Sequence, residues 1–162
     1  MLPKGCRRTY RDAMTDTVDP TTITAMVHNA IPALGRLGLE VLALSPGSVD
    51  LKMPLEPNKN HIGTMYAGAL MSLAEVPGGL LPLAMPELAV VPIVTHIEVE
   101  FLHPARTDAT LTASIPADEL RELAGRAHAE GKAEFTLETV AVDAQGTPLL
   151  SCRGTYQLRP AK

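Results

Sequence analysis

Apolar residues recur along this chain with two different periods, and each period predicts one type of secondary structure. Between Pro20 and Leu34 the spacing is that of a helix face, which predicts an amphipathic helix ending near Gly35 or Gly38. The expected apolar face of this helix consists of Ile23, Met26, Val27, Ala30, Ile31 and Leu34. Strict alternation of apolar and polar residues elsewhere predicts strands. The alternating segments are 37–43, 49–55, 93–101, 109–115, 133–141 and 150–158.

The segment Ala67–Val76 fits neither pattern, because only Ser72 and Glu75 are polar within it. Its many Ala, Leu and Met residues predict a helix that is buried on most sides. Pro77 lacks the N–H group that continues a helix, so we expect a break or kink there. Residues 80–85 are then expected to continue helically after the break.

The order of these elements favours one architecture. A helix and two strands precede the apolar helix, and four strands follow it, with an exposed helix predicted over 117–130. An antiparallel sheet with one apolar face must cover that face, and the central helix is the only wholly apolar one. We therefore expect an α+β fold in which a six-stranded antiparallel sheet wraps around this helix. Such a sheet leaves an edge strand that a second copy of the chain can cover.

Length and composition narrow the possible functions. Residues 19–162 are long enough for one domain, and the polar, aperiodic residues 1–18 are expected to be a flexible arm. A net charge of −4 argues against nucleic acid as a partner. No stretch reaches the ~18 apolar residues of a membrane span, and the N-terminus has no secretory apolar run. Cys6 and Cys152 lie far apart without nearby histidines, so we expect a cytoplasmic protein without a disulfide framework or metal site.

The segment from Asn60 to Gly79 resembles the hotdog-fold thioesterases, and most closely their PaaI-like acyl-CoA thioesterase group; it reads NHIGTMYAGALMSLAEVPGG. Asn60 stands six residues before Tyr66, and Glu75 stands nine residues after it. In that group, an Asn, a His-Gly-Gly triplet and an acidic residue have the same spacings. The family's third strand is similar to VTHIEVEFLHPA, and its terminal hairpin is similar to GKAEFTLETVAVDAQGTPLLSCRGTYQLRP. The resemblance covers residues 20–160 and implies a hotdog fold.

The chain departs from the family pattern at the triplet, where Tyr66 replaces the His and Ala67 replaces the first Gly. Alanine still has a backbone N–H group, so it can keep an oxyanion role. The family's Ser or Thr on the third strand aligns with Val94, and Thr95 lies beside it. Because alternation places these two on opposite faces, we expect only one of them to reach the site.

Thioester hydrolysis needs a base or nucleophile and donors for the developing oxyanion. Glu75, in an apolar segment, is expected to have a raised pKa and either to activate water or to attack the carbonyl. Ala67 and Gly68 stand where a helix start offers unpaired N–H groups, although small residues also allow close packing. Asn60 either orients the attacking water or closes its own loop. Tyr66 either donates a hydrogen bond from its hydroxyl to the thioester carbonyl or is a packing residue.

The resemblance implies a coenzyme A thioester as substrate, with no cofactor and no metal. Candidate substrate contacts are Gly68, His61, Met71 and Val94, although a loop His is commonly only solvated and a Met commonly fills a core.

Three functions remain open, in falling order. The first is an acyl-CoA thioesterase that works as a dimer or dimer of dimers, with Asn60 and Ala67 from one chain and Glu75 with Thr95 or Val94 from the other. The second is an acyl-CoA-binding hotdog protein without catalysis. The third is a hydratase, which requires a His beside an acid at the helix start, and this helix has none.

Overall fold

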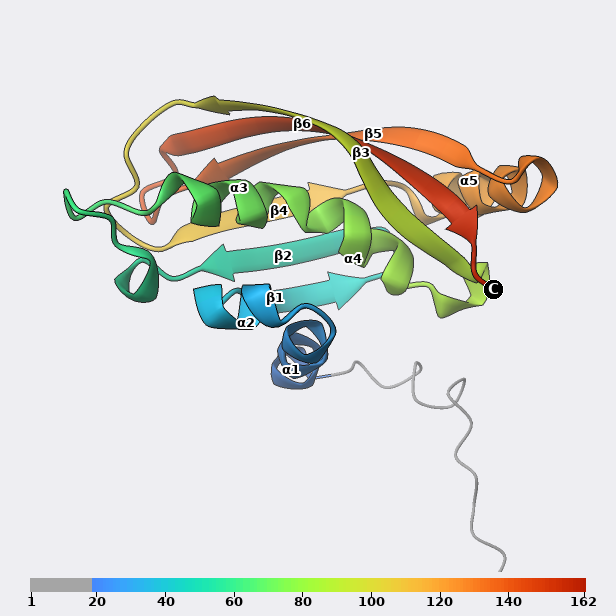
Figure 1. The fold of residues 1–162 in the computed structure, drawn as a ribbon, viewed down its shortest axis with the longest axis horizontal. Helices are drawn as coiled ribbons and strands as arrows, with labels where there is room; N and C mark the ends of the chain where they lie inside the picture. Colours follow the sequence, from blue (N-terminus) through green and yellow to red (C-terminus); the bar gives the residue numbers. More distant parts are fainter. Residues whose placement is uncertain (1–18) are drawn as a thin grey trace, which may run out of the picture.

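The computed structural model describes residues 19–162, so the predicted arm over 1–18 lies outside the described residues. Six strands form one antiparallel sheet in the order β1-β2-β4-β5-β6-β3. The sheet curves around the central helices α3 and α4, which lie on its concave side (Figure 1). This confirms the expected α+β architecture. The elements are α1 (Pro20–Ala30), α2 (Pro32–Leu37), β1 (Glu40–Ser45), β2 (Ser48–Met53), η1 (Glu56–Asn58), α3 (Ala67–Glu75), α4 (Pro77–Leu83), η2 (Pro86–Leu88), β3 (Val90–Phe101), β4 (Ala109–Ser114), α5 (Ala117–Glu130), β5 (Ala133–Val142) and β6 (Pro148–Pro160).

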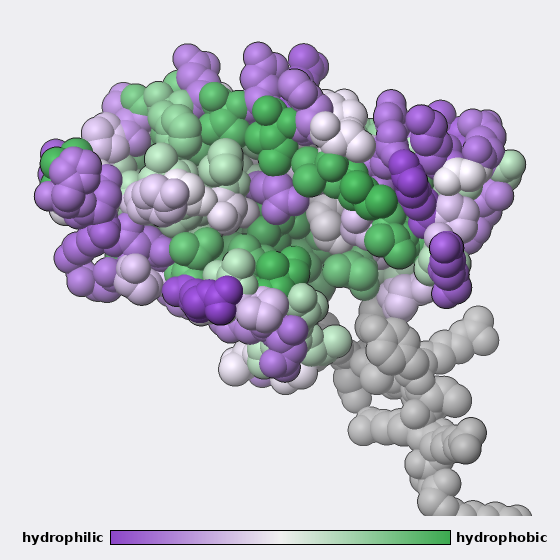
Figure 2. Space-filling view, viewed as in Figure 1, coloured by the Kyte–Doolittle hydropathy of each residue, from purple (hydrophilic) through white to green (hydrophobic). Residues whose placement is uncertain are grey.

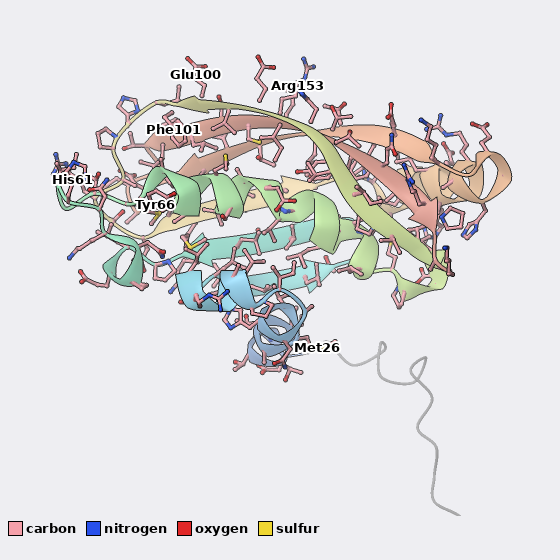
Figure 3. The ribbon with its side chains drawn as sticks, viewed as in Figure 1. Met26, His61, Tyr66, Glu100, Phe101 and Arg153 are labelled. Atoms are coloured by element: carbon pink, nitrogen blue, oxygen red, sulfur yellow. The ribbon has the colours of Figure 1, made fainter. Side chains whose placement is uncertain are left out.

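The N-terminal helical segment is divided, so the prediction of one continuous helix was wrong. Helix α1 ends where Ile31 leaves the helical conformation, with φ −131° and ψ 84°, and α2 begins at Pro32. The break has a local cause, because a residue that precedes proline is disfavoured in the helical region. Met26 and Ile31, predicted for the apolar face, are 55% and 50% exposed. Met26 points away from the sheet (Figure 3).

Strand β1 starts later than predicted and is irregular. Leu37 is the last residue of α2 rather than part of a strand. The register shifts between Val41 and Ala43, which marks a bulge. As a result Leu39 and Val41 are buried, whereas Ala43 is exposed instead of continuing their face.

The core lies between the concave face of the sheet and the central helices. The alternation predicted for β2, β4, β5 and β6 is confirmed, because every second residue of these strands is buried. From the central helix the buried residues are Ala69, Leu70, Leu73 and Ala74. Helix α5 was expected to be exposed, but one of its faces is buried through Leu120, Leu123, Ala124 and Ala127. No helix among residues 19–162 is long and apolar enough to cross a membrane.

Strand β3 is an edge strand whose only partner within the described sheet is β6. Most of its residues are exposed, including apolar ones. Figure 2 shows a diagonal band of hydrophobic residues along β3 and further hydrophobic residues over α3 and α4, with hydrophilic residues at the two ends of the molecule. The exposed large apolar residues of β3 are Val91, Ile93, Val94 and Phe101.

Candidate active site

The loop that leads into α3 is closed by the side chain of Asn60. Its Oδ1 accepts hydrogen bonds from the N–H groups of Ile62 and Thr64 at 3.0 and 3.2 Å. Its Nδ2 donates to Thr64 Oγ1 at 2.9 Å and to the Met65 carbonyl at 3.4 Å. All donors and acceptors of this amide are therefore engaged in the loop. Of the two predicted roles for Asn60, the loop-closing one matches these contacts.

The start of α3 presents backbone donors without partners. The Tyr66 carbonyl accepts from the N–H groups of Ala69 and Leu70 at 3.0 and 3.3 Å. The N–H groups of Ala67 and Gly68 have no hydrogen-bond partner within residues 19–162, as expected for the first turn of a helix. These donors and the positive end of the helix dipole make this turn suitable for an oxyanion.

Tyr66 covers part of this helix start. Its side chain is 58% exposed, so it is not a core residue. Its ring lies against Gly68: a Cβ atom at Gly68 would stand 2.3 Å from Tyr66 Cε1, which no side chain could accommodate without moving the ring. A larger residue at this position would therefore displace the exposed Tyr66 ring. Figure 3 shows Tyr66 at the beginning of α3.

Glu75 is the last residue of α3 and is only partly buried. Burial raises its pKa above 4.5, and no hydrogen bond or ion pair within the described part of the chain offsets this shift. The neighbouring titratable groups are Cys152 and Tyr156 on β6. Burial raises the pKa of both, and the Glu75 carboxylate raises them further. A carboxyl group with a raised pKa and no structural partner is suited to general-base chemistry.

Ala67, Met71 and Glu75 lie on one face of α3, because they are spaced four residues apart. This face points away from the core: Ala67 is exposed, Met71 is 45% exposed and Glu75 is half-buried. Met71 therefore does not fill the core, which had been its alternative role. The side chains of Ala67 and Glu75 therefore lie on the same side of the helix.

A bulge in β3 decides which of Val94 and Thr95 faces the central helix. The register shifts between Val94 and His96, so Thr95 is the inserted residue. Val94 lies opposite Tyr156, whose side chain is in the core, and therefore lies on the concave face. The Thr95 hydroxyl donates to the Thr155 carbonyl at 3.2 Å. Regular alternation, as predicted for this strand, does not hold across the bulge.

His61 lies apart from the other candidates. It is exposed at the tip of the loop, away from α3 (Figure 3). Within residues 19–162, His, Cys, Asp and Glu side chains form no group that could hold a metal ion.

Comparison with known proteins shows which family the chain belongs to. Residues 20–158 match the family described as a domain of unknown function, DUF4442. The chain belongs to this family. A solved structure from Pseudomonas aeruginosa, described as a protein of unknown function and probable thioesterase, is 40% identical, with a TM-score of 0.79 over 87% of this chain and 96% of that one. No curated protein matches the sequence.

More distant solved structures support the fold. A thioesterase from Haemophilus influenzae is 15% identical, with a TM-score of 0.64 over 89% of this chain and 92% of that one. A mutant thioesterase enzyme from Staphylococcus aureus is 19% identical, with a TM-score of 0.64 over 80% of this chain and 99% of that one. The DUF4442 chain thus has the hotdog fold that its sequence resembles.

Sequence reasoning missed one residue at this site. Tyr156 lies in the predicted strand 150–158, but the hydrogen bond from its hydroxyl to the Glu75 backbone carbonyl was not predicted. A signal was present, because a Tyr at a buried strand position must place its hydroxyl on a partner.

Proposed function

We propose that this DUF4442 protein is an acyl-CoA thioesterase whose active site is completed by a second copy of the chain. The observation that carries this proposal is the half-buried Glu75 carboxyl group of α3, which has a raised pKa and no hydrogen-bond or ion-pair partner within residues 19–162. The description of the relative that is 40% identical as a probable thioesterase supports the reaction class.

The spacing along α3 favours a site built from two copies of the chain. Ala67 and Glu75 are eight residues apart in one helix, which corresponds to about 12 Å along the axis. A base must come within about 3 Å of the water it activates, while the oxyanion donors contact the same thioester carbonyl. Two chains related by a two-fold axis bring the two groups together if the start of one α3 faces the Glu75 of the other.

The open edge of β3 is where we expect the two copies to meet. It offers unpaired backbone groups and the exposed side chains of Val91, Ile93 and Phe101. Pairing there would extend the sheet through both copies and would cover the apolar band. A dimer, or a dimer of dimers built from it, is the expected assembly.

The proposed reaction uses Glu75 of one chain as the base. Its carboxylate takes a proton from water, and the resulting hydroxide attacks the thioester carbonyl. The N–H groups of Ala67 and Gly68 from the other chain bind the oxyanion. Collapse of the tetrahedral intermediate breaks the C–S bond, and the proton held by Glu75 passes to the coenzyme A thiolate. Direct attack by Glu75, giving an anhydride that water then hydrolyses, is the other form of this mechanism.

The remaining candidates have supporting roles in this proposal. Asn60 holds the loop so that α3 begins at Ala67. The Tyr66 hydroxyl replaces the family's His as a donor to the thioester carbonyl. Met71 and Val94 contact the acyl chain, and His61 lies at the rim of the substrate site.

Thr95 fixes the β3 bulge that turns Val94 inward. Coenzyme A is part of the substrate, so no cofactor and no metal enter the reaction.

Glu75→Gln tests the proposal. Removal of a general base is expected to lower kcat by about 100-fold to 10,000-fold, measured by thiol release from short, medium, long and aryl acyl-CoAs. Glu100→Gln is the matched control, because Glu100 lies on the convex face of the sheet (Figure 3). Full activity of the Glu75→Gln variant would remove the case for hydrolysis at this site.

The ring of Tyr66 favours a second candidate function, binding of acyl-CoA without hydrolysis. The ring rests on Gly68, beside the donors that an oxyanion would need. This function predicts saturable acyl-CoA binding with no thiol released by the parent protein. Calorimetric titration combined with the thiol-release assay separates the two functions.

A further inference from the structure

Tyr156 reaches from β6 to the end of α3. The side chain is 1% exposed, and its hydroxyl donates a hydrogen bond to the Glu75 backbone carbonyl at 2.9 Å. Its ring stacks on Phe135, with the ring centroids 5.3 Å apart. The hydrogen bond joins Tyr156 to Glu75, which are 81 positions apart in the chain. It therefore ties the sheet directly to the residue proposed as the base.

The helix break explains why the Glu75 carbonyl is available. In a continuous helix it would accept a hydrogen bond from the N–H of Gly79. Gly79 instead donates to the Val76 carbonyl at 3.0 Å, because Pro77 starts a new helix. A carbonyl left inside the protein without a partner is costly. The Tyr156 hydroxyl supplies that partner from another element.

Two glycines make room for the Tyr156 ring. A Cβ atom at Gly78 on α4 would stand 2.1 Å from Cε1 of the ring, and one at Gly154 on β6 would stand 2.6 Å from Cε2. Gly79, the next residue along α4, has nothing within 4 Å of its Cβ position. The requirement for glycine is thus specific to the positions that touch the ring.

We propose that Tyr156 is a positioning residue, which holds the Glu75 backbone at the helix break and so sets the direction in which the Glu75 carboxylate points. This proposal rests on the function proposed above for Glu75. Tyr156 is 1% exposed and acts through the backbone of Glu75 rather than by touching substrate. Burial, and then the Glu75 carboxylate, raise the pKa of Tyr156. Its hydroxyl therefore keeps its proton and remains a donor at neutral pH.

Tyr156→Phe tests the proposal, because it removes the hydroxyl and keeps the ring. Loss of one ordinary hydrogen bond corresponds to about a tenfold change. We expect kcat for acyl-CoA hydrolysis to fall about tenfold while KM changes less than about twofold. The carboxyl titration in the pH–rate profile should also move towards the ordinary Glu value, since the side chain is freed to turn to water. The titratable neighbours of Glu75 among the described residues, Cys152 and Tyr156, are uncharged at neutral pH.

The adjacent glycines provide a matched pair. Gly78→Ala forces the Tyr156 ring to move and is expected to reproduce the loss of kcat. Gly79→Ala makes the same change one residue later, in open space, and is expected to keep the parent kcat. This pair also tests the proposal if Tyr156→Phe does not fold.

A readout that needs no substrate separates this proposal from the proposed function. The Glu75 carboxyl is titrated by NMR after ¹³C labelling, and amide hydrogen exchange is followed at Gly79 and Leu80. If the parent releases no thiol from any acyl-CoA, the proposed function fails, and these measurements alone decide the role of Tyr156. A Tyr156→Phe variant with a shifted Glu75 titration and faster exchange supports positioning. A variant with a lower Tm but unchanged kcat and Glu75 titration overturns it.

Discussion

The two edges of the sheet are built in opposite ways. Strand β1 has 6 residues, contains a bulge and is hydrogen-bonded to a side chain of α1. There the Val41 N–H donates to Thr24 Oγ1 at 2.9 Å, and His28 Nε2 donates to the Leu39 carbonyl at 2.7 Å. Strand β3 has 12 residues and no strand on its outer side within the described sheet. Polar side chains of a helix satisfy one edge, whereas the other edge is long, apolar and open.

This difference favours β3 as the edge that we propose a second copy of the chain covers. An open apolar strand is an aggregation hazard unless something covers it. The chain removes that hazard at β1 with its own N-terminal helix, and at β3 it does not. Glu75 lies next to β6, the strand that pairs with β3, because the Tyr156 hydroxyl of β6 donates to its backbone carbonyl. The candidate catalytic carboxylate therefore lies beside the strand that pairs with the uncovered edge.

The largest expected effect comes from placing a charge on the open edge. Lys at position 93 would place a charge on the apolar edge that the proposed pairing covers. Ile93→Lys is expected to give a monomer and to lower thioester hydrolysis about 100-fold or more, since base and oxyanion donors are separated. Sedimentation and thiol release measure the two effects.

Leu42→Lys is the matched control on the closed edge. Leu42 is 42% exposed and Ile93 is 41% exposed, so the two changes differ mainly in which edge they modify. Leu42→Lys should keep both assembly and activity. Equal behaviour of the two variants would contradict the assignment of β3 as the pairing edge.

A smaller effect, on the free energy of unfolding, is expected when the hydrogen bond between α1 and β1 is removed. Thr24→Val keeps the shape of the side chain but leaves the Val41 N–H without its partner. Loss of this bond should lower the free energy of unfolding by about 1–3 kcal/mol, measured by urea denaturation. Thr21→Val, at an exposed position of α1, should change it by less than about 0.5 kcal/mol. Similar losses in both would mean that Thr24 does not protect the β1 edge.

The smallest expected effect is a pH dependence of stability that arises from Glu75, best seen in the monomeric Ile93→Lys background. Burial raises the pKa of Glu75 above 4.5, so the native state holds a proton that the unfolded chain releases. The associated stability is fully present below pH 4.5 and is lost as the pH rises through the raised pKa. Adding Glu75→Gln should remove this decline. Urea unfolding across this range checks it, and parallel curves for the two proteins would contradict the buried state of Glu75.

Much of the fold was predictable because its information is local. Alternation in β2, β4, β5 and β6 and the apolar run of α3 each reflect burial of one element against its neighbours. The break at Ile31 also had a local cause in Pro32, but the longer helical periodicity masked it. The bulge at Thr95 arises from pairing with β6, which no local pattern of β3 encodes.

For the candidate site, the sequence predicted Glu75 but not the contacts that surround it. Glu75 could be found because a lone acid in an apolar segment is unusual, and its raised pKa follows from burial. The contact between Tyr156 and the Glu75 carbonyl could not, since it depends on how the end of α3 meets a strand 81 residues later. The engagement of the Asn60 amide in its own loop likewise appears only in three dimensions.

Cys152 can serve as a probe of local opening of the structure. This free thiol is buried in β6 near the Glu75 carboxyl group, and its pKa is raised by burial. A shielded, protonated thiol reacts with an alkylating reagent only during the brief moments when the structure around it opens. The labelling rate of Cys152, followed by peptide mass, therefore measures how often the structure around it opens.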